Sequence, residues 1–291
     1  MTTRANARGA LLAAALLSAG CAGASAPRVD ELPLRGVDAC GPTAGGALVA
    51  ASDVAFAIDS SMSTQLPSGV DVDLDGETGR FDGVATSDRG DSMLAAQVAA
   101  VRSVLRSVRH RDARFSIVSY AGLRRFPDRE PSMRLVSSRE AALHADMTER
   151  IDDAEAALDR VLAGGSRGNT DFSAALLVAL RTHAEAREAG TPRRKLVLLI
   201  SDSPTPIVAH ARHAFVRSDP FLSYPSARLL TAVRRARRAG VSVHTFGVGE
   251  AATAEPPHTL SVIARTTGGT HHAVRDPARL HCALLEVLSR S

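Results

Sequence analysis

The chain has 291 residues, a length that suits one α/β domain with a sizeable core. Hydrophobic residues make up 45% of it and charged residues 23%, which is typical of a folded domain. Aromatic residues reach only 3%, with no Trp, which argues against surfaces that stack bases or sugar rings. The formal charge of +4 falls to +2 without Arg4 and Arg8 of the leader. The other arginines are scattered, so we expect no nucleic-acid binding.

Residues 1–20 are typical of a bacterial lipoprotein signal peptide. Arg4 and Arg8 form a positive start, and residues 10–17 form an apolar core that is too short to span a bilayer. The ending Leu17-Ser-Ala-Gly-Cys21 resembles a lipobox, which implies that Cys21 becomes the lipidated first residue. Ala22 after it implies sorting to the outer membrane, with the domain on the periplasmic or the surface face. Ordinary secretion with cleavage within residues 22–26 is the alternative.

Residues 21–50 are rich in Gly, Ala and Pro, and we expect a flexible linker there. The short apolar run 54–58 then predicts a buried strand. Asp59, Ser61 and Ser63 follow it at alternating positions, which places a carboxylate and two hydroxyls in one turn above the strand end. Hard cations such as Mg²⁺, Mn²⁺ and Ca²⁺ prefer such oxygen ligands. Alone this pattern is weak evidence, because short motifs often match by chance.

An acidic insertion covers approximately residues 66–91. Its acids and glycine follow the spacing of an EF-hand loop, with one more acid at the twelfth place and a backbone carbonyl at the seventh. The loop lacks flanking helices and ends in Asp, so it is closer to helix-free D-x-D-x-D-G loops. Because clustered carboxylates repel one another without a cation, we expect Ca²⁺ here rather than a solvated acidic loop. The expected ligands are Asp71, Asp73, Asp75, Glu77 and Asp82, to which Asp88 and Asp91 are additional candidates.

The remaining elements alternate between helices and strands. Periodicity predicts helices over 93–108, 151–162, 172–189, 226–239, 259–266 and 277–289. It predicts strands over 114–120, 195–200, 241–248 and 270–274, with a short antiparallel edge strand over 133–136. Such alternation indicates a doubly wound, mostly parallel sheet that is flanked by helices.

Two later segments extend the first motif. The Gly-rich loop 165–171 carries Thr170 directly before a predicted helix, and the apolar strand 195–200 runs into Asp202. Ligands in open α/β sheets bind at the carboxyl ends of strands, where these oxygens fall. The order D-x-S-x-S, Thr, Asp resembles the von Willebrand factor A (VWA) family over residues 51–291. The resemblance implies a Rossmann-like fold and a metal-ion-dependent adhesion site at Asp59, Ser61, Ser63, Thr170 and Asp202.

The same resemblance implies a function. Met62, Asn169 and Ser203 stand where the family usually has Gly, but no ligand oxygen is missing. The implied activity is binding and not catalysis, so we expect no catalytic residues. Mg²⁺ or Mn²⁺ would capture an exposed Asp or Glu of a partner protein on the bacterial cell envelope, where the lipid on Cys21 holds the domain at the membrane.

Two other classes of function are open at this point. Gly90-Asp-Ser-Met-Leu94 is similar to the nucleophile block of GDSL-type hydrolases, in which Ser92 would need Asp276 and His281 as partners. Ser92 is also explained as a helix N-cap. A hydrolase that uses Ser92 or the metal is therefore one alternative, and a structural envelope protein with a purely stabilising metal is the other.

The two cysteines other than Cys21 are Cys40 and Cys282. An exported chain folds in an oxidising compartment, and the ends of a compact domain often lie close together. We therefore expect a disulfide between them, with two unpaired thiols as the alternative.

Overall fold

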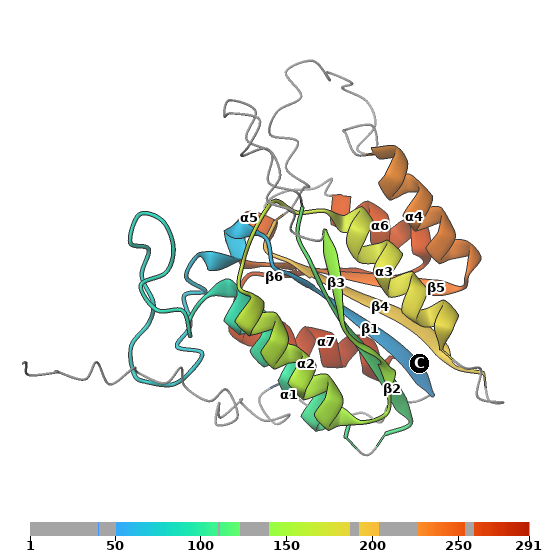
Figure 1. The fold of residues 1–291 in the computed structure, drawn as a ribbon, viewed down its shortest axis with the longest axis horizontal. Helices are drawn as coiled ribbons and strands as arrows, with labels where there is room; N and C mark the ends of the chain where they lie inside the picture. Colours follow the sequence, from blue (N-terminus) through green and yellow to red (C-terminus); the bar gives the residue numbers. More distant parts are fainter. Residues whose placement is uncertain are drawn as a thin grey trace, which may run out of the picture.

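A mixed sheet of six strands runs through the described part of the chain in the order β3-β2-β1-β4-β5-β6 (Figure 1). The computed structural model describes residues 40, 51–109, 111–122, 140–186, 192–203, 226–253 and 259–290. The predicted signal peptide, Cys21, most of the linker and the predicted strand 133–136 lie outside these ranges. The strands are β1 Ser52–Asp59, β2 Ala113–Tyr120, β3 Ala141–Thr148, β4 Arg194–Ser201, β5 Val241–Val248 and β6 His271–Val274.

Neighbouring strands are parallel, except that β3 pairs antiparallel with β2 at one edge. Three helices cover one face of the sheet: α1 Met93–Ser107, α2 Ile151–Gly164 and α7 Leu280–Ser289. Three cover the other: α3 Phe172–Glu185, α4 Ser226–Arg238 and α6 Thr259–Thr267 (Figure 1). The shorter elements are η3 Met62–Gln65, α5 Gly249–Thr253 and η5 Pro277–Arg279. The predicted doubly wound sheet with one antiparallel edge strand is confirmed.

The central strands are covered on both faces, which explains their continuous apolar sequences. Residues 54–58 of β1 have no exposed surface. Val54, Phe56 and Ile58 face α1, α2 and α7, whereas Ala55 and Ala57 face α3, α4 and α6. Alternation along the strand thus divides the core into two layers, one on each face of the sheet.

The edge strand β3 lies at 141–148, where the sequence predicted neither a helix nor a strand. Its residues Ala-Ala-Leu-His-Ala-Asp-Met-Thr are half-buried or exposed and lack a period-two apolar pattern. Pairing with β2 therefore decides its conformation, and local propensity does not. At the other end of the domain, Asp276 caps the short helix η5, so the predicted helix 277–289 is split into η5 and α7.

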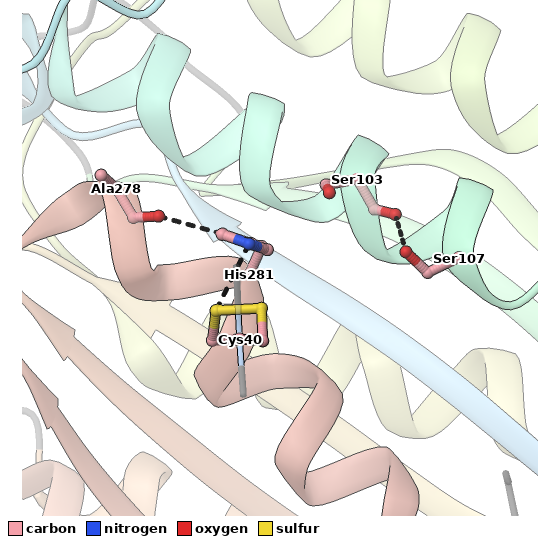
Figure 2. Close-up of a disulfide and its surroundings, with 6 residues drawn as sticks. Cys40, Ser103, Ser107, Ala278 and His281 are labelled. Carbon is pink, nitrogen blue, oxygen red and sulfur yellow. Dashed lines mark hydrogen bonds between the residues drawn. A yellow bond between two sulfur atoms is a disulfide. The ribbon is translucent and has the colours of Figure 1, made fainter. Parts of the chain in front are cut away.

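The expected disulfide is present: Cys40 is bonded to Cys282, with their Cα atoms 5.1 Å apart (Figure 2). It joins the segment before β1 to α7 across a separation of 242 residues. In the chain-entropy view such a long closed loop restricts the unfolded chain, which stabilises the fold by about 4–5 kcal/mol. His281 packs beside the bond, with Nε2 3.3 Å from Cys282 Sγ (Figure 2). Within the described residues, no helix combines the length and the apolar character of a membrane span.

Candidate metal-binding site

The first loop of the site follows β1, which ends at the fully buried Asp59. Asp59 Oδ1 accepts a hydrogen bond from the backbone N–H of Ser61 at 2.8 Å, which folds the loop back over the strand end. The hydroxyls of Ser61 and Ser63 lie 3.0 Å apart. Ser63 Oγ donates to Asp202 Oδ1 at 2.8 Å, so the D-x-S-x-S turn reaches the end of β4.

Thr170 belongs to the loop between α2 and α3, and backbone hydrogen bonds hold this second loop against the first. The Met62 N–H donates to the Gly168 carbonyl at 3.0 Å, and the Arg167 N–H donates to the Ser60 carbonyl at 2.7 Å. The two loops therefore meet at the same end of the sheet, although about 100 residues separate them in the sequence.

A glycine positions the second loop from its other side. Gly122, which follows β2, forms an antiparallel bridge with Asn169, and the Asn169 N–H donates to the Gly122 carbonyl at 3.2 Å. A Cβ atom at residue 122 would lie 3.1 Å from the carbonyl carbon of Asn169. A side chain at residue 122 would therefore require Asn169, the residue next to Thr170, to shift by a few tenths of an ångström.

The two carboxylates of the site are strongly perturbed. Asp59 is fully buried and Asp202 is 7% exposed. Burial raises the pKa of Asp59 to about 6, although hydrogen bonds from Ser201 and Ser61 oppose the shift. Burial, followed by the negative charge of Asp59, raises the pKa of Asp202 to about 8. Two buried carboxylates that repel each other raise the free energy of the folded state unless a cation lies beside them.

The oxygen of Thr170 is the second sign of a ligand. Its hydroxyl Oγ1 is buried and has no hydrogen-bond partner among the described residues. Buried hydroxyls almost always have a partner, because an unpaired one loses its interaction with water without compensation. Two carboxylates and three hydroxyls form an all-oxygen donor set, which fits the chemistry of Mg²⁺, Mn²⁺ or Ca²⁺.

The three positions that depart from the family pattern keep ordinary backbone conformations. Among the described residues, the only one other than glycine with a positive φ is Leu74, in the acidic insertion. Met62, Asn169 and Ser203 therefore need none of the conformations that favour glycine.

Two residues support Asp59 that the sequence did not single out. Ser201 Oγ donates to Asp59 Oδ2 at 2.6 Å, and Tyr120 lies beneath the site with its hydroxyl donating to the Ile200 carbonyl at 2.7 Å. The only sequence signal for Ser201 is its position before Asp202. Tyr120 carries none, because the pairing of β1 with β2 and β4 is what brings it there.

The acidic insertion gathers its carboxylates around a buried residue. Asp91 has no exposed surface and accepts hydrogen bonds from the backbone N–H groups of Val72 at 2.5 Å and Gly79 at 2.7 Å. Two overlapping groups have carboxylate oxygens within 4.8 Å of one another: Asp71, Asp73 and Asp91, and Asp73, Asp75 and Asp88. Asp71 Oδ1 is buried without a hydrogen-bond partner in the described residues.

The carboxylate of Asp82 lies outside these groups, and Glu77 is expected to offer its backbone carbonyl, which groups of carboxylates do not include. Asp82 Oδ1 accepts hydrogen bonds from the backbone N–H groups of Val84 and Ala85, both at 2.9 Å, and so closes its own exposed turn. Glu77 is exposed, and its backbone N–H donates to Asp75 Oδ1 at 2.8 Å. Asp88 and Asp91 take the places beside Asp71, Asp73 and Asp75.

The residues of the hydrolase alternative have local roles. Ser92 is the N-cap of α1, where its Oγ accepts a hydrogen bond from the Ala95 N–H at 3.1 Å. Asp276 caps η5 in the same way, through the Ala278 N–H. His281 Nδ1 lies 2.9 Å from the Ala278 carbonyl (Figure 2), and a carbonyl can only accept, so Nδ1 carries the proton.

Known structures share this fold. The structure entitled "von Willebrand factor type A from Catenulispora acidiphila" has a TM-score of 0.52 at 17% identity, covering 82% of this chain and 42% of that one. The pilus adhesin SpaC from Lactobacillus rhamnosus GG has a TM-score of 0.51 at 13% identity, covering 81% of this chain and 30% of that one. These identities show similarity of fold alone. No curated protein that was compared with the sequence matches it significantly.

The family assignment rests on the sequence. Residues 53–281 match the von Willebrand factor type A domain, a span that includes every residue of the site described above. Domains of this family typically bind proteins, often bind a divalent metal and are usually not catalytic. The chain therefore belongs to the von Willebrand factor type A domain family.

Proposed function

We propose that this domain is a metal-dependent protein-binding module of the adhesion type. Asp59, Ser61, Ser63, Thr170 and Asp202 would hold Mg²⁺ or Mn²⁺. The observation that carries the proposal is the buried pair Asp59 and Asp202, connected by hydrogen bonds through Ser61 and Ser63, beside a loop whose Thr170 hydroxyl has no partner in the described structure. The hydrolase alternative lacks a comparable observation, because Ser92, Asp276 and His281 have local roles. A structural protein with a stabilising metal would use the same metal site, so partner binding has to separate it from an adhesion module.

The residues present suit a binding role. Asp59 is fixed by hydrogen bonds from Ser61 and Ser201, so its carboxylate keeps one orientation. Three of the five proposed ligands are neutral hydroxyls, so they offset none of the charge of the cation. A bound divalent ion would supply an attractive centre for an Asp or Glu side chain of a partner protein.

Capture of a partner from the cell envelope tests this proposal. The immobilised domain should retain a partner in Mg²⁺ or Mn²⁺, release it in EDTA, and recapture it when the ion is restored. Retention that EDTA leaves unchanged would favour a structural role for the metal. Turnover of generic ester or phosphoester substrates by the purified protein would favour the hydrolase.

We also propose that the domain is held at the outer membrane by a lipid on Cys21. The disulfide Cys40–Cys282 supports an oxidising compartment outside the cytoplasm. Mature protein should partition into detergent, and Cys21→Ala should move it to the aqueous phase, whereas Ala24→Ser in the same segment should not. Equal partitioning of the wild type and Cys21→Ala would contradict lipidation.

A second ion, Ca²⁺, is proposed for the acidic insertion. The two overlapping carboxylate groups and the unpartnered oxygen of Asp71 support it. The insertion is tied to the first loop of the site, since the Thr86 N–H donates to the Gln65 carbonyl at 2.8 Å. An ion here would therefore also stabilise the surroundings of the proposed adhesion site.

Limited proteolysis within residues 71–91 tests for this ion. Cleavage should slow in Ca²⁺ and resume in EGTA, and the double variant Asp73→Ala, Asp75→Ala should lose the protection. Comparison of Asp82→Ala with Asp88→Ala then shows which acid is a ligand. Asp82 is the one that the EF-hand spacing predicts, and Asp88 is the one that lies beside Asp73 and Asp75. Cleavage at equal rates with and without Ca²⁺ would leave only a solvated loop.

A further inference from the structure

A cavity of about 310 Å³ opens at the opposite end of the sheet from Asp59. It lies between the start of β4, the first half of β5, the turn before β6 and the end of α7. Its residue Arg194 pairs in register with Ser52, seven residues before Asp59 on β1, so the cavity is roughly 20 Å from the proposed metal site. The two sites are therefore separate.

The cavity is basic. Three cations line it, Arg194, Lys195 and Arg290, and none of its described lining residues is acidic. Arg290 forms a salt bridge with Glu286, whereas Arg194 and Lys195 form none with the described residues. By strand alternation the side chain of Lys195 belongs to the other face of the sheet, so among the described residues Arg194 is the uncompensated cation of the cavity.

One nitrogen of the Arg194 guanidinium is buried without a partner among the described residues. This nitrogen is Nη1, and Arg194 as a whole is half-buried. A guanidinium carries five N–H donors in a planar fork that matches an oxyanion, and a shielded donor without an acceptor costs free energy. A negatively charged acceptor inside the cavity would pair with this Nη1 donor of Arg194.

Neutral donors stand beside this cation. The backbone N–H of Thr270 donates to His244 Nδ1 at 3.2 Å, so the neutral imidazole carries its proton on Nε2. Burial, followed by the charges of His272, Arg194 and Arg290, lowers the pKa of His244 to about 4, so the ring is neutral near pH 7. Ser242 adds a hydroxyl to the lining.

The cavity has room for a ligand larger than one water. Leu196 on β4 and Val287 on α7 lie at its floor, where they are only 2% and 1% exposed. The volume exceeds the ~30 Å³ that one water occupies in the liquid, so there is room for a small organic molecule. One uncompensated positive charge matches one negative charge, and a planar guanidinium matches a planar carboxylate.

We propose that this cavity is a second binding site, which takes a small monocarboxylate with its charged end on Arg194. The carboxylate belongs either to a free short-chain acid or to the carboxyl end of a peptide, since both present the same group. The site is independent of the metal, so it stands whether or not the proposed adhesion function does.

The test uses butyrate as the probe and its neutral isostere butyramide as the control, at constant ionic strength and in EDTA. Butyrate should shift the imidazole NMR signals of His244 in a saturable manner, and butyramide should not. Acetyl-diglycine serves as a peptide carboxyl end, and its affinity relative to butyrate distinguishes the two sources. Phosphate should bind at least tenfold more weakly than the better carboxylate.

Arg194→Met keeps the aliphatic stem and should weaken butyrate binding at least tenfold. Arg234→Met, on the exposed side of α4, is the matched control and should bind as the wild type does. Ser242→Ala, which leaves the charge in place, should weaken binding by a smaller factor. Failure of both carboxylates to bind the wild type, equal binding by Arg194→Met, or tighter binding of phosphate would each overturn the proposal.

Discussion

Substitution of Asp59 by Ala should abolish binding of Mg²⁺ and Mn²⁺ and, with it, capture of the protein partner. Asp59 is fully buried and hydrogen-bonded on both carboxylate oxygens, so its replacement removes a charged ligand that is held in a fixed orientation. Calorimetric titration of the EDTA-treated, dialysed protein measures the effect. The affinity should fall by more than 100-fold, since a direct charged ligand is lost.

Two other variants calibrate this result. Thr170→Ala removes one neutral ligand that water can replace, so the affinity should fall by only about tenfold. Asp146 is an exposed acid on the edge strand β3 and is not a proposed ligand, so Asp146→Ala should bind both ions as the wild type does. If the wild type and Asp59→Ala bind both ions equally, the metal-site proposal is wrong.

The stability of the EDTA-treated protein should fall as pH rises from about 6.5 to about 8. The folded protein keeps a proton on Asp202, whose pKa is raised to about 8, whereas the unfolded chain has lost that proton near pH 3.8. The folded state therefore binds more protons in this window, and raising the pH favours unfolding. At about 1.4 kcal/mol for each pH unit, the loss approaches 2 kcal/mol.

Between pH 6.5 and 8 the effect of Asp202 on stability can be distinguished from that of the histidines. Burial lowers the pKa of His144, His183, His244 and His272, so their protonation destabilises the fold only below about pH 6.5, with the opposite sign. Urea unfolding at several pH values, in EDTA and in Mg²⁺, measures the trend. Asp202→Asn should remove the decline in EDTA. A decline that persists in Asp202→Asn would assign it to another group.

The sequence by itself determined the parts of this domain that are encoded locally. Residues 54–58 and 196–200 are apolar because both faces of a central parallel strand are buried, so they predict strands without reference to the rest of the chain. Asp59 and Asp202 follow these strands directly, and parallel strands bring their carboxyl ends to one edge. The order of elements therefore predicted that the two acids would meet.

Tertiary structure decided what depends on pairing between distant segments. The edge strand β3 owes its conformation to β2 and not to its own residues. The bridge between Gly122 and Asn169 positions Thr170, and Ser201 donates a hydrogen bond to Asp59. Neither contact can be predicted from a periodic pattern in the sequence. In the acidic insertion, spacing favoured Asp82 and offered Asp88 and Asp91 only as additional candidates, whereas the fold gathers Asp88 and Asp91 beside Asp71, Asp73 and Asp75.

The cavity around Arg194 belongs wholly to this second class, because its residues come from two strands, a turn and a helix end. In the sequence Arg194 is one of many scattered arginines. Local propensity and hydrophobic period act over a few residues, and they fix which segments become helices or strands. Which side chains then share a site depends on strand order and loop contacts, and only the assembled sheet sets these.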